Sequence, residues 1–77
     1  MEIHLQLYSI LREQLPPETK GEAVLQLDEG ATLADILIKL NINRKVVISV
    51  NDILEVEVSR ILRDGDEVMI FSSVSGG

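Results

Sequence analysis

The 77-residue sequence contains no cysteine and no tryptophan, and its aromatic residues are one tyrosine and one phenylalanine. Without cysteine the chain can form no disulfide, thiol nucleophile, zinc–thiolate site or iron–sulfur cluster. Its single histidine cannot supply a metal site with several histidine ligands. We therefore expect no metal centre and a fold that is stabilised by side-chain packing alone.

Basic residues are also scarce. The chain has seven Lys and Arg and thirteen Asp and Glu, which gives a net charge of -6. Nucleic-acid binding needs a basic stripe, and single-strand binding also needs stacking aromatics, so neither is expected. No apolar run approaches the roughly 20 residues of a membrane-spanning helix. The first residues lack the basic segment of a secretory signal. We expect a cytoplasmic protein whose negative field attracts basic partners.

The sequence is rich in residues that can form a hydrophobic core, since 45% of its residues are apolar. Its length is sufficient for one small domain. Apolar and polar residues alternate, as in half-buried strands, in five segments: residues 1–8, 22–28, 46–50, 54–58 and 68–71. The fourth segment is predicted to be a short edge strand, because Glu55 and Glu57 would face outward.

One segment has the pattern of an amphipathic helix about nine residues long. Thr32 precedes Asp35 by three residues, a spacing that lets each side chain bond the other's backbone at a helix start. Asn41 is predicted to be a left-handed C-cap. Four leucine and isoleucine side chains then share one helix face: Leu33, Ile36, Leu37 and Leu40.

A second, shorter helix is predicted from a Ser9 cap to about Gln14, where Pro16-Pro17 would end it. Its apolar contacts would be Ile10 and Leu11, with Leu15 as a further candidate. Turns are predicted at Asn51-Asp52 and around Gly65, and a tight helical turn over residues 59–62 would place Leu62 in the core.

These elements predict an α+β fold, with four or five strands and one main helix that covers a single sheet face. Residues 1–71 would form the domain and residues 72–77 a flexible tail. Tyr8, Met69 and Phe71 alternate onto the face without a helix, with Val47 beside them. We expect them to form a partner-binding patch at the base of the tail.

The body of the predicted domain holds little that could catalyse a reaction. His4 faces outward with no nucleophile at a diagnostic spacing. Asp64, Asp66 and Glu67 are interpreted as a turn with solvated acids, because the spacing of a calcium loop is absent. Glu55 and Glu57 are interpreted as exposed residues that aid solubility. The chain is not expected to be an enzyme on its own.

The last four residues, Val74, Ser75, Gly76 and Gly77, could instead carry chemistry. Six extended residues from Ser72 onward would reach roughly 20 Å from the sheet. Gly76 and Gly77 have no side chains and could enter a channel too narrow for other residues. The Gly77 carboxylate is a group that a partner enzyme could activate with ATP. A frayed terminus without a function is the alternative.

Several segments together resemble the MoaD/ThiS family of sulfur carriers, above all the small subunit of molybdopterin synthase. They are LYSILRE at residues 7–13, VN at 50–51, LRDGDEV at 62–68, Phe71 and VSGG at 74–77. The resemblance implies a ubiquitin-like β-grasp fold with a mixed sheet. It also implies that an E1-like adenylyltransferase adenylates Gly77 and that a sulfur-donor protein supplies sulfur for a thiocarboxylate. Both modifications are transient, and no permanent cofactor is implied.

For the molybdopterin type, the resemblance implies that the tail inserts into the large subunit of molybdopterin synthase and donates sulfur to precursor Z. The sequence departs from the family where Ser72-Ser73 replace two frequent prolines, which raises the cost of ordering the tail. The long connection over residues 9–21 favours the molybdopterin type over the thiamine type. Two alternatives stay open: a ubiquitin-like protein modifier joined to lysine through Gly77, and an interaction domain with an inert tail.

Overall fold

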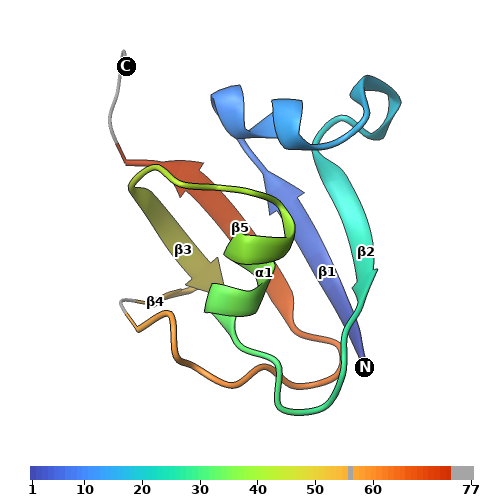
Figure 1. Cartoon of the computed structure of the whole chain (residues 1–77), viewed down its shortest axis with the longest axis vertical. Coiled ribbons are helices and arrows are strands. Elements are labelled where there is room, and N and C mark those ends of the chain that lie inside the picture. Colours follow the sequence, from blue (N-terminus) through green and yellow to red (C-terminus); the bar gives the residue numbers. More distant parts are fainter. Residues whose placement is uncertain (56, 74–77) are drawn as a thin grey trace.

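The computed structural model describes residues 1–55 and 57–73. Its elements are β1 (Glu2–Leu7), the 3-10 helices η1 (Ser9–Gln14) and η2 (Pro17–Thr19), β2 (Glu22–Gln26), α1 (Leu33–Lys39), β3 (Val46–Val50), β4 (Ile53–Glu55) and β5 (Glu67–Ser72). The strands form one sheet in the order β2-β1-β5-β3-β4 (Figure 1). β1 and β5 are parallel and the other pairs are antiparallel. This is the α+β arrangement, with a mixed sheet and one main helix, that the sequence predicts.

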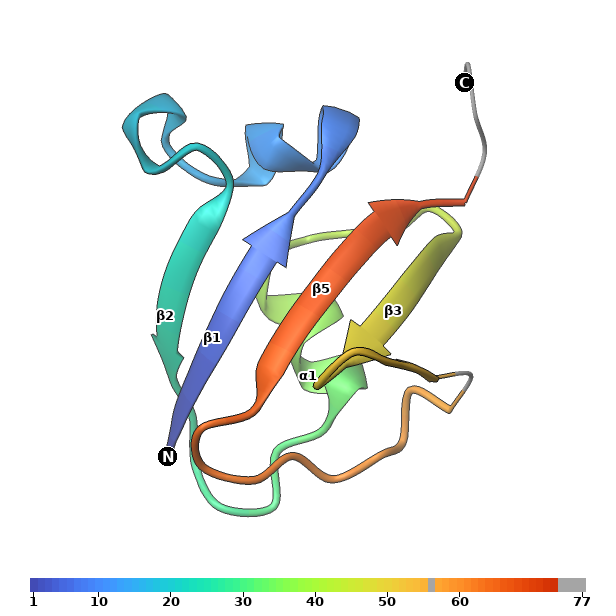
Figure 2. The same cartoon turned by 180° about the vertical axis from the view of Figure 1, so that it is seen from behind.

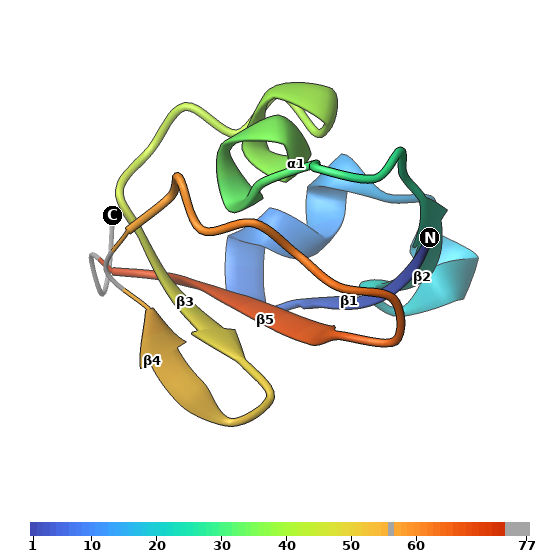
Figure 3. The same ribbon diagram turned by 90° about the horizontal axis from the view of Figure 1, so that it is seen from below.

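The α1 helix covers one face of the sheet, and the other face is seen uncovered from behind (Figures 2 and 3). We call the uncovered side the open face. Between α1 and the sheet lies a core whose strand residues alternate as predicted, because successive strand side chains point to opposite faces. The core consists of Ile3, Leu5, Leu7, Leu11, Leu25, Leu33, Ile36, Ile42, Ile48, Val50, Leu62, Val68 and Ile70.

The predicted start of α1 is confirmed, and Asn41 is left-handed as predicted but follows the C-cap, which is Leu40. The Asp35 N–H donates to Thr32 Oγ1 at 3.4 Å, and the Thr32 N–H donates to Asp35 Oδ2 at 2.8 Å. Asn41 adopts a left-handed φ of 57°, and the Ile42 N–H donates to the Leu37 carbonyl at 2.9 Å. The helix itself spans seven residues rather than about nine.

The connection between β1 and β2 corrects two predictions. η1 occupies the predicted residues, but Tyr8 is its N-cap and no side chain caps it, so Ser9 does not have the predicted role. Ile10 is 45% exposed, and Leu11 alone of η1 is buried. A 3-10 helix places residues three apart on the same side, so it offers a narrower apolar face than the α-helix that the sequence suggested.

The second half of the chain contains the predicted turns. Asn51 and Asp52 have φ of 51° and 68° between β3 and β4, and Gly65 has φ of 87°. Leu62 is buried as predicted, although residues 59–62 form no helical turn. β4 is the predicted edge strand but ends at Glu55; the Val56 of the longer predicted strand lies outside the described residues.

Two acidic residues are not solvated as the sequence suggested. The Glu55 carboxylate accepts a hydrogen bond from Arg60 Nη1 and pairs with its charge. Asp66 is 7% exposed and accepts hydrogen bonds from the chain around it. Alternation within one segment does not show contacts with residues elsewhere in the chain, and those contacts determine the burial of both carboxylates.

Candidate functional site

The open face carries the residues that the sequence assigned to partner binding. Val68 and Ile70 of β5 point into the core, so Met69 and Phe71 lie on the open face. The Tyr8 N–H donates to the Ile70 carbonyl at 3.2 Å, which extends the parallel pairing of β1 and β5 by one residue. This bond places the Tyr8 ring beside Met69 and Phe71, the two residues that flank Ile70 in β5.

The rings of Tyr8 and Phe71 are stacked, with centroids 4.4 Å apart and planes 5° apart. The Tyr8 hydroxyl lies 3.8 Å from Met69 Sδ. Val47 of β3 pairs with Phe71 in the antiparallel register and is also on this face. We call Tyr8, Val47, Met69 and Phe71 the aromatic patch. Stacking fixes both rings before any partner arrives, which lowers the entropy cost of binding through them.

A shallow hollow of about 290 Å³ continues the open face away from the aromatic patch. Tyr8 and Met69 line its apolar side, and His4, Glu22 and Glu67 line its polar side. His4 Nε2 lies 3.7 Å from the Glu2 carboxylate, and both side chains are about half exposed. The arrangement is typical of a binding surface with an apolar centre and a polar border.

The described part of the chain contains no group of three or more His, Asp and Glu side chains that could hold a metal ion. Asp64 Oδ1 instead accepts the Glu2 N–H at 2.6 Å, which joins the turn before β5 to the start of β1. This hydrogen bond gives Asp64 a role in stabilising the fold. No helix within residues 1–55 and 57–73 is long and apolar enough to cross a membrane.

The described chain ends next to β3. β5 includes Ser72, one residue beyond the predicted domain boundary, and the Ser73 N–H donates to the Lys45 carbonyl at 3.3 Å. Val74, Ser75, Gly76 and Gly77 lie outside the described residues. Their predicted role therefore stays a prediction, whereas the structure defines the place from which they start.

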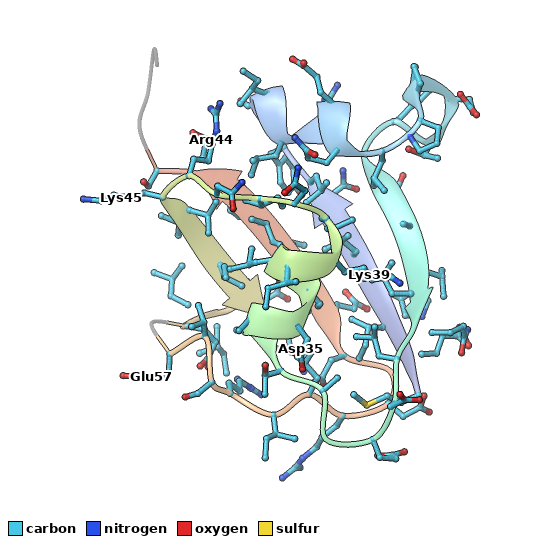
Figure 4. All side chains as sticks on the ribbon, viewed as in Figure 1. Asp35, Lys39, Arg44, Lys45 and Glu57 are labelled. Atoms are coloured by element: carbon cyan, nitrogen blue, oxygen red, sulfur yellow. The ribbon has the colours of Figure 1, made fainter. Side chains whose placement is uncertain are left out.

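Sequence reasoning missed two basic residues at this place. Arg44 and Lys45 are both exposed and stand beside the end of β5 (Figure 4). They are the only two consecutive basic residues in the chain, a signal that was available from the sequence. Their significance depends on the pairing of β3 with β5, which the sequence alone did not establish.

Comparison with known proteins relates the whole domain to a family. Residues 5–77 match the model of the ThiS family. No curated protein matches the chain by sequence. Solved structures share the fold, which confirms the predicted ubiquitin-like β-grasp.

Three of these structures show how far the likeness extends. The HVO 2177 protein of Haloferax volcanii is 23% identical, with a TM-score of 0.78 over 100% of this chain and 87% of that one. The small archaeal modifier protein 1 of the same organism is 17% identical, with a TM-score of 0.74 over 95% and 98%. A structure of subunits 1 and 2 of the molybdopterin-converting factor from Helicobacter pylori contains a chain that is 17% identical, with a TM-score of 0.66 over 100% of both.

Proposed function

The chain belongs to the ThiS family, and from this premise we propose that it is a sulfur carrier for molybdopterin synthesis that works through Gly77. The observation that carries the proposal is the family match, which includes Gly76 and Gly77.

The proposed chemistry begins at the Gly77 carboxylate. One carboxylate oxygen attacks the α-phosphorus of ATP on an E1-like adenylyltransferase, pyrophosphate leaves, and an acyl adenylate forms. A persulfide sulfur of a donor protein then attacks the carbonyl carbon and AMP leaves. A second thiol cleaves the resulting acyl disulfide, so that the two electrons come from thiol oxidation and Gly77 keeps a thiocarboxylate. Covalent attachment holds the reactive sulfur in place for its acceptor.

Precursor Z is the proposed acceptor, within a complex with the large subunit of molybdopterin synthase. The connection between β1 and β2 supports this choice over thiamine synthesis, because it holds both η1 and η2 and places Leu11 in the core. The fold shared with the molybdopterin-converting factor of Helicobacter pylori agrees with it. Thiamine or another sulfur-containing metabolite is the alternative acceptor.

Intact-mass spectrometry of the protein purified from its own cells tests the proposal. We expect a fraction whose mass increases by one oxygen-to-sulfur exchange, located at Gly77 by fragmentation. Covalent adducts with lysines of other proteins would show a protein modifier instead. If Gly77 is unmodified and its deletion does not affect growth, the remaining hypothesis is an interaction domain with an inert tail.

A reconstituted reaction tests the acceptor. Thiocarboxylated protein, the large subunit and precursor Z should yield molybdopterin, and a variant extended by tryptophan after Gly77 should not, provided that mass spectrometry shows the extension intact. Sulfur transfer to a thiamine precursor but not to precursor Z would assign the carrier to the other pathway.

A further inference from the structure

Charged side chains are divided between the two ends of the sheet. One end, which we call the β5 end, is where β1 and β5 finish and β2 and β3 begin. Residues 8–22 and 40–45 lie at this end, and Figure 4 shows Arg44 and Lys45 there and Lys39 between the two ends. The turns and connections at the opposite end contain residues 1–4, 27–35, 51–55 and 57–67, with Asp35 and Glu57 on that side in the same view.

The two ends have opposite net charge. The β5 end holds four basic residues, Arg12, Lys20, Arg44 and Lys45, and three acidic residues, Glu13, Glu18 and Glu22, which gives a net charge of +1. The opposite end holds two basic and ten acidic residues, a net of -8. With Lys39, which lies between the two ends, they make up the 7 basic residues, the 13 acidic residues and the total of -6. The chain's overall charge therefore conceals a positive end.

The basic side chains of the β5 end are also free to meet a partner. All four are exposed, and none of them forms an ion pair with another described residue. At the opposite end Arg60 pairs with Glu55, and the charges of Arg60 and Arg63 act on Asp66. Arg60 and Arg63 thus interact with acidic residues of their own end, whereas the basic residues of the β5 end form no ion pair within the described chain.

A hollow at the β5 end offers further donors for carboxylates. It measures about 340 Å³ and lies between η1 and the connection from α1 to β3. Gln14, Asn41, Asn43 and Arg44 line it, with Leu11 and Ile42 as its apolar part. Amide and guanidinium N–H groups are the donors that recognise carboxylates, and Arg can bond one with both nitrogens.

We propose that the β5 end is a docking surface for an acidic protein surface around the site that receives Gly77. The charge division would orient the domain during its approach, so that the end from which residues 74–77 start arrives first. This inference rests on the proposed function, because it takes the partner to be the enzyme that acts on Gly77. It differs from the expectation from net charge, because the surface nearest that enzyme would favour an acidic partner.

Two charge-matched variants test the inference. Arg44→Gln/Lys45→Gln removes two positive charges from the β5 end, and Ser59→Glu/Ile61→Glu adds two negative charges at exposed positions of the opposite end. Both variants change the total charge from -6 to -8. Their association rates with the E1-like adenylyltransferase of the source organism are measured by stopped flow, in low salt and in about 0.3 M NaCl, where charges are largely screened.

We expect the association rate of the wild type to fall as salt rises. In low salt, Arg44→Gln/Lys45→Gln should associate about 10-fold more slowly than Ser59→Glu/Ile61→Glu, which should stay within about 2-fold of the wild type. The difference between the variants should disappear in high salt. Equal rates for the two variants in low salt would overturn the inference, as would a wild-type rate that rises with salt.

ATP–pyrophosphate exchange at saturating carrier separates this inference from the proposed function. We expect equal maximal exchange rates for the wild type and for Arg44→Gln/Lys45→Gln. The docking surface affects the rate of association and not the adenylation of Gly77. No exchange with the wild type would overturn the proposed function and this inference with it. Exchange without any difference in association rate between the variants would overturn the inference alone. Binding of phosphatidylserine vesicles or single-stranded RNA that is lost in Arg44→Gln/Lys45→Gln, with enzyme association unchanged, would do the same.

Discussion

Asn51 and Asp66 are joined by a hydrogen bond of 2.9 Å from Asn51 Nδ2 to Asp66 Oδ1, which ties the β3–β4 turn to the residue before β5. The Asn51 amide oxygen in turn accepts the Glu67 N–H at 3.0 Å. The second Asp66 oxygen accepts the Arg63 N–H at 2.9 Å. Two residues of the family-like segments VN and LRDGDEV therefore meet in the structure, with a role in folding.

Replacing Asp66 by alanine should destabilise the domain. The substitution leaves the Asn51 amide and the Arg63 N–H without their acceptor in a site where Asp66 is 7% exposed. We expect a loss of about 1–3 kcal/mol in the free energy of unfolding, measured by urea denaturation. Glu29→Ala, at an exposed position, is the control and should change it by less than about 0.5 kcal/mol. Equal effects of the two substitutions would contradict the prediction.

The same carboxylate should make stability depend on acid. Burial by itself raises the pKa of Asp66, but the hydrogen bonds from Arg63 and Asn51 and the charges of Arg60 and Arg63 together hold this pKa below its usual 3.8. A pKa lower in the folded than in the unfolded state stabilises the fold above 3.8, and this contribution is lost as the pH falls from 3.8 through the folded value. The difference in unfolding free energy between wild type and Asp66→Asn should be constant near neutral pH and shrink below 3.8. A difference that grows with acidity would show the opposite shift.

The stacked pair Tyr8 and Phe71 should matter more for binding than for folding. We expect Phe71→Ala to weaken binding to the activating enzyme, measured by calorimetry, while circular dichroism shows an intact fold. A double-mutant cycle with Tyr8→Ala should give a coupling of about 0.5–1.5 kcal/mol for the stacked rings. Val24→Ala, an exposed change on β2, is the control for binding. Equal binding by Phe71→Ala and Val24→Ala would remove the aromatic patch from the interface.

Two isoleucines of α1 offer a matched test of the core. Ile36 is 0% exposed and Ile38 is 76% exposed on the same helix. Ile36→Ala should cost about 2–5 kcal/mol of unfolding free energy, because it leaves a cavity under the helix. Ile38→Ala should change stability by less than about 0.5 kcal/mol. Thermal and urea denaturation measure both, and a similar cost at the two positions would contradict the packing of α1.

Gly21 should not tolerate a side chain. It has a φ of +83°, and an added Cβ would lie 2.5 Å from the Leu7 carbonyl oxygen. Gly30 has a similar φ of +90°, but an added Cβ there would have no atom within 4 Å. Gly30→Ala therefore introduces backbone strain without a steric clash. We expect about 1 kcal/mol of destabilisation for Gly30→Ala and at least about 2 kcal/mol for Gly21→Ala. Equal melting temperatures of the two variants would show that the close approach is relieved elsewhere.

The aromatic patch shows how far sequence reasoning reaches. Alternation correctly assigned Met69 and Phe71 to the face opposite Val68 and Ile70, because strand side chains change face at every residue. It could not show that Tyr8 stacks on Phe71, since that contact depends on the parallel pairing of β1 with β5. For the same reason the sequence did not reveal the contact between Asn51 and Asp66.

By itself, the sequence determined where the strands lie, the capping of α1 by Thr32 and Asp35, and the turn at Asn51 and Asp52. These depend on backbone preferences and side chains within a few residues. Only the tertiary structure decided which distant residues became neighbours, and hence that Glu55 is paired and Asp66 buried. It also decided that Arg44 and Lys45 lie beside Ser73, because strand order is set by the burial of the whole sheet and not by any one segment.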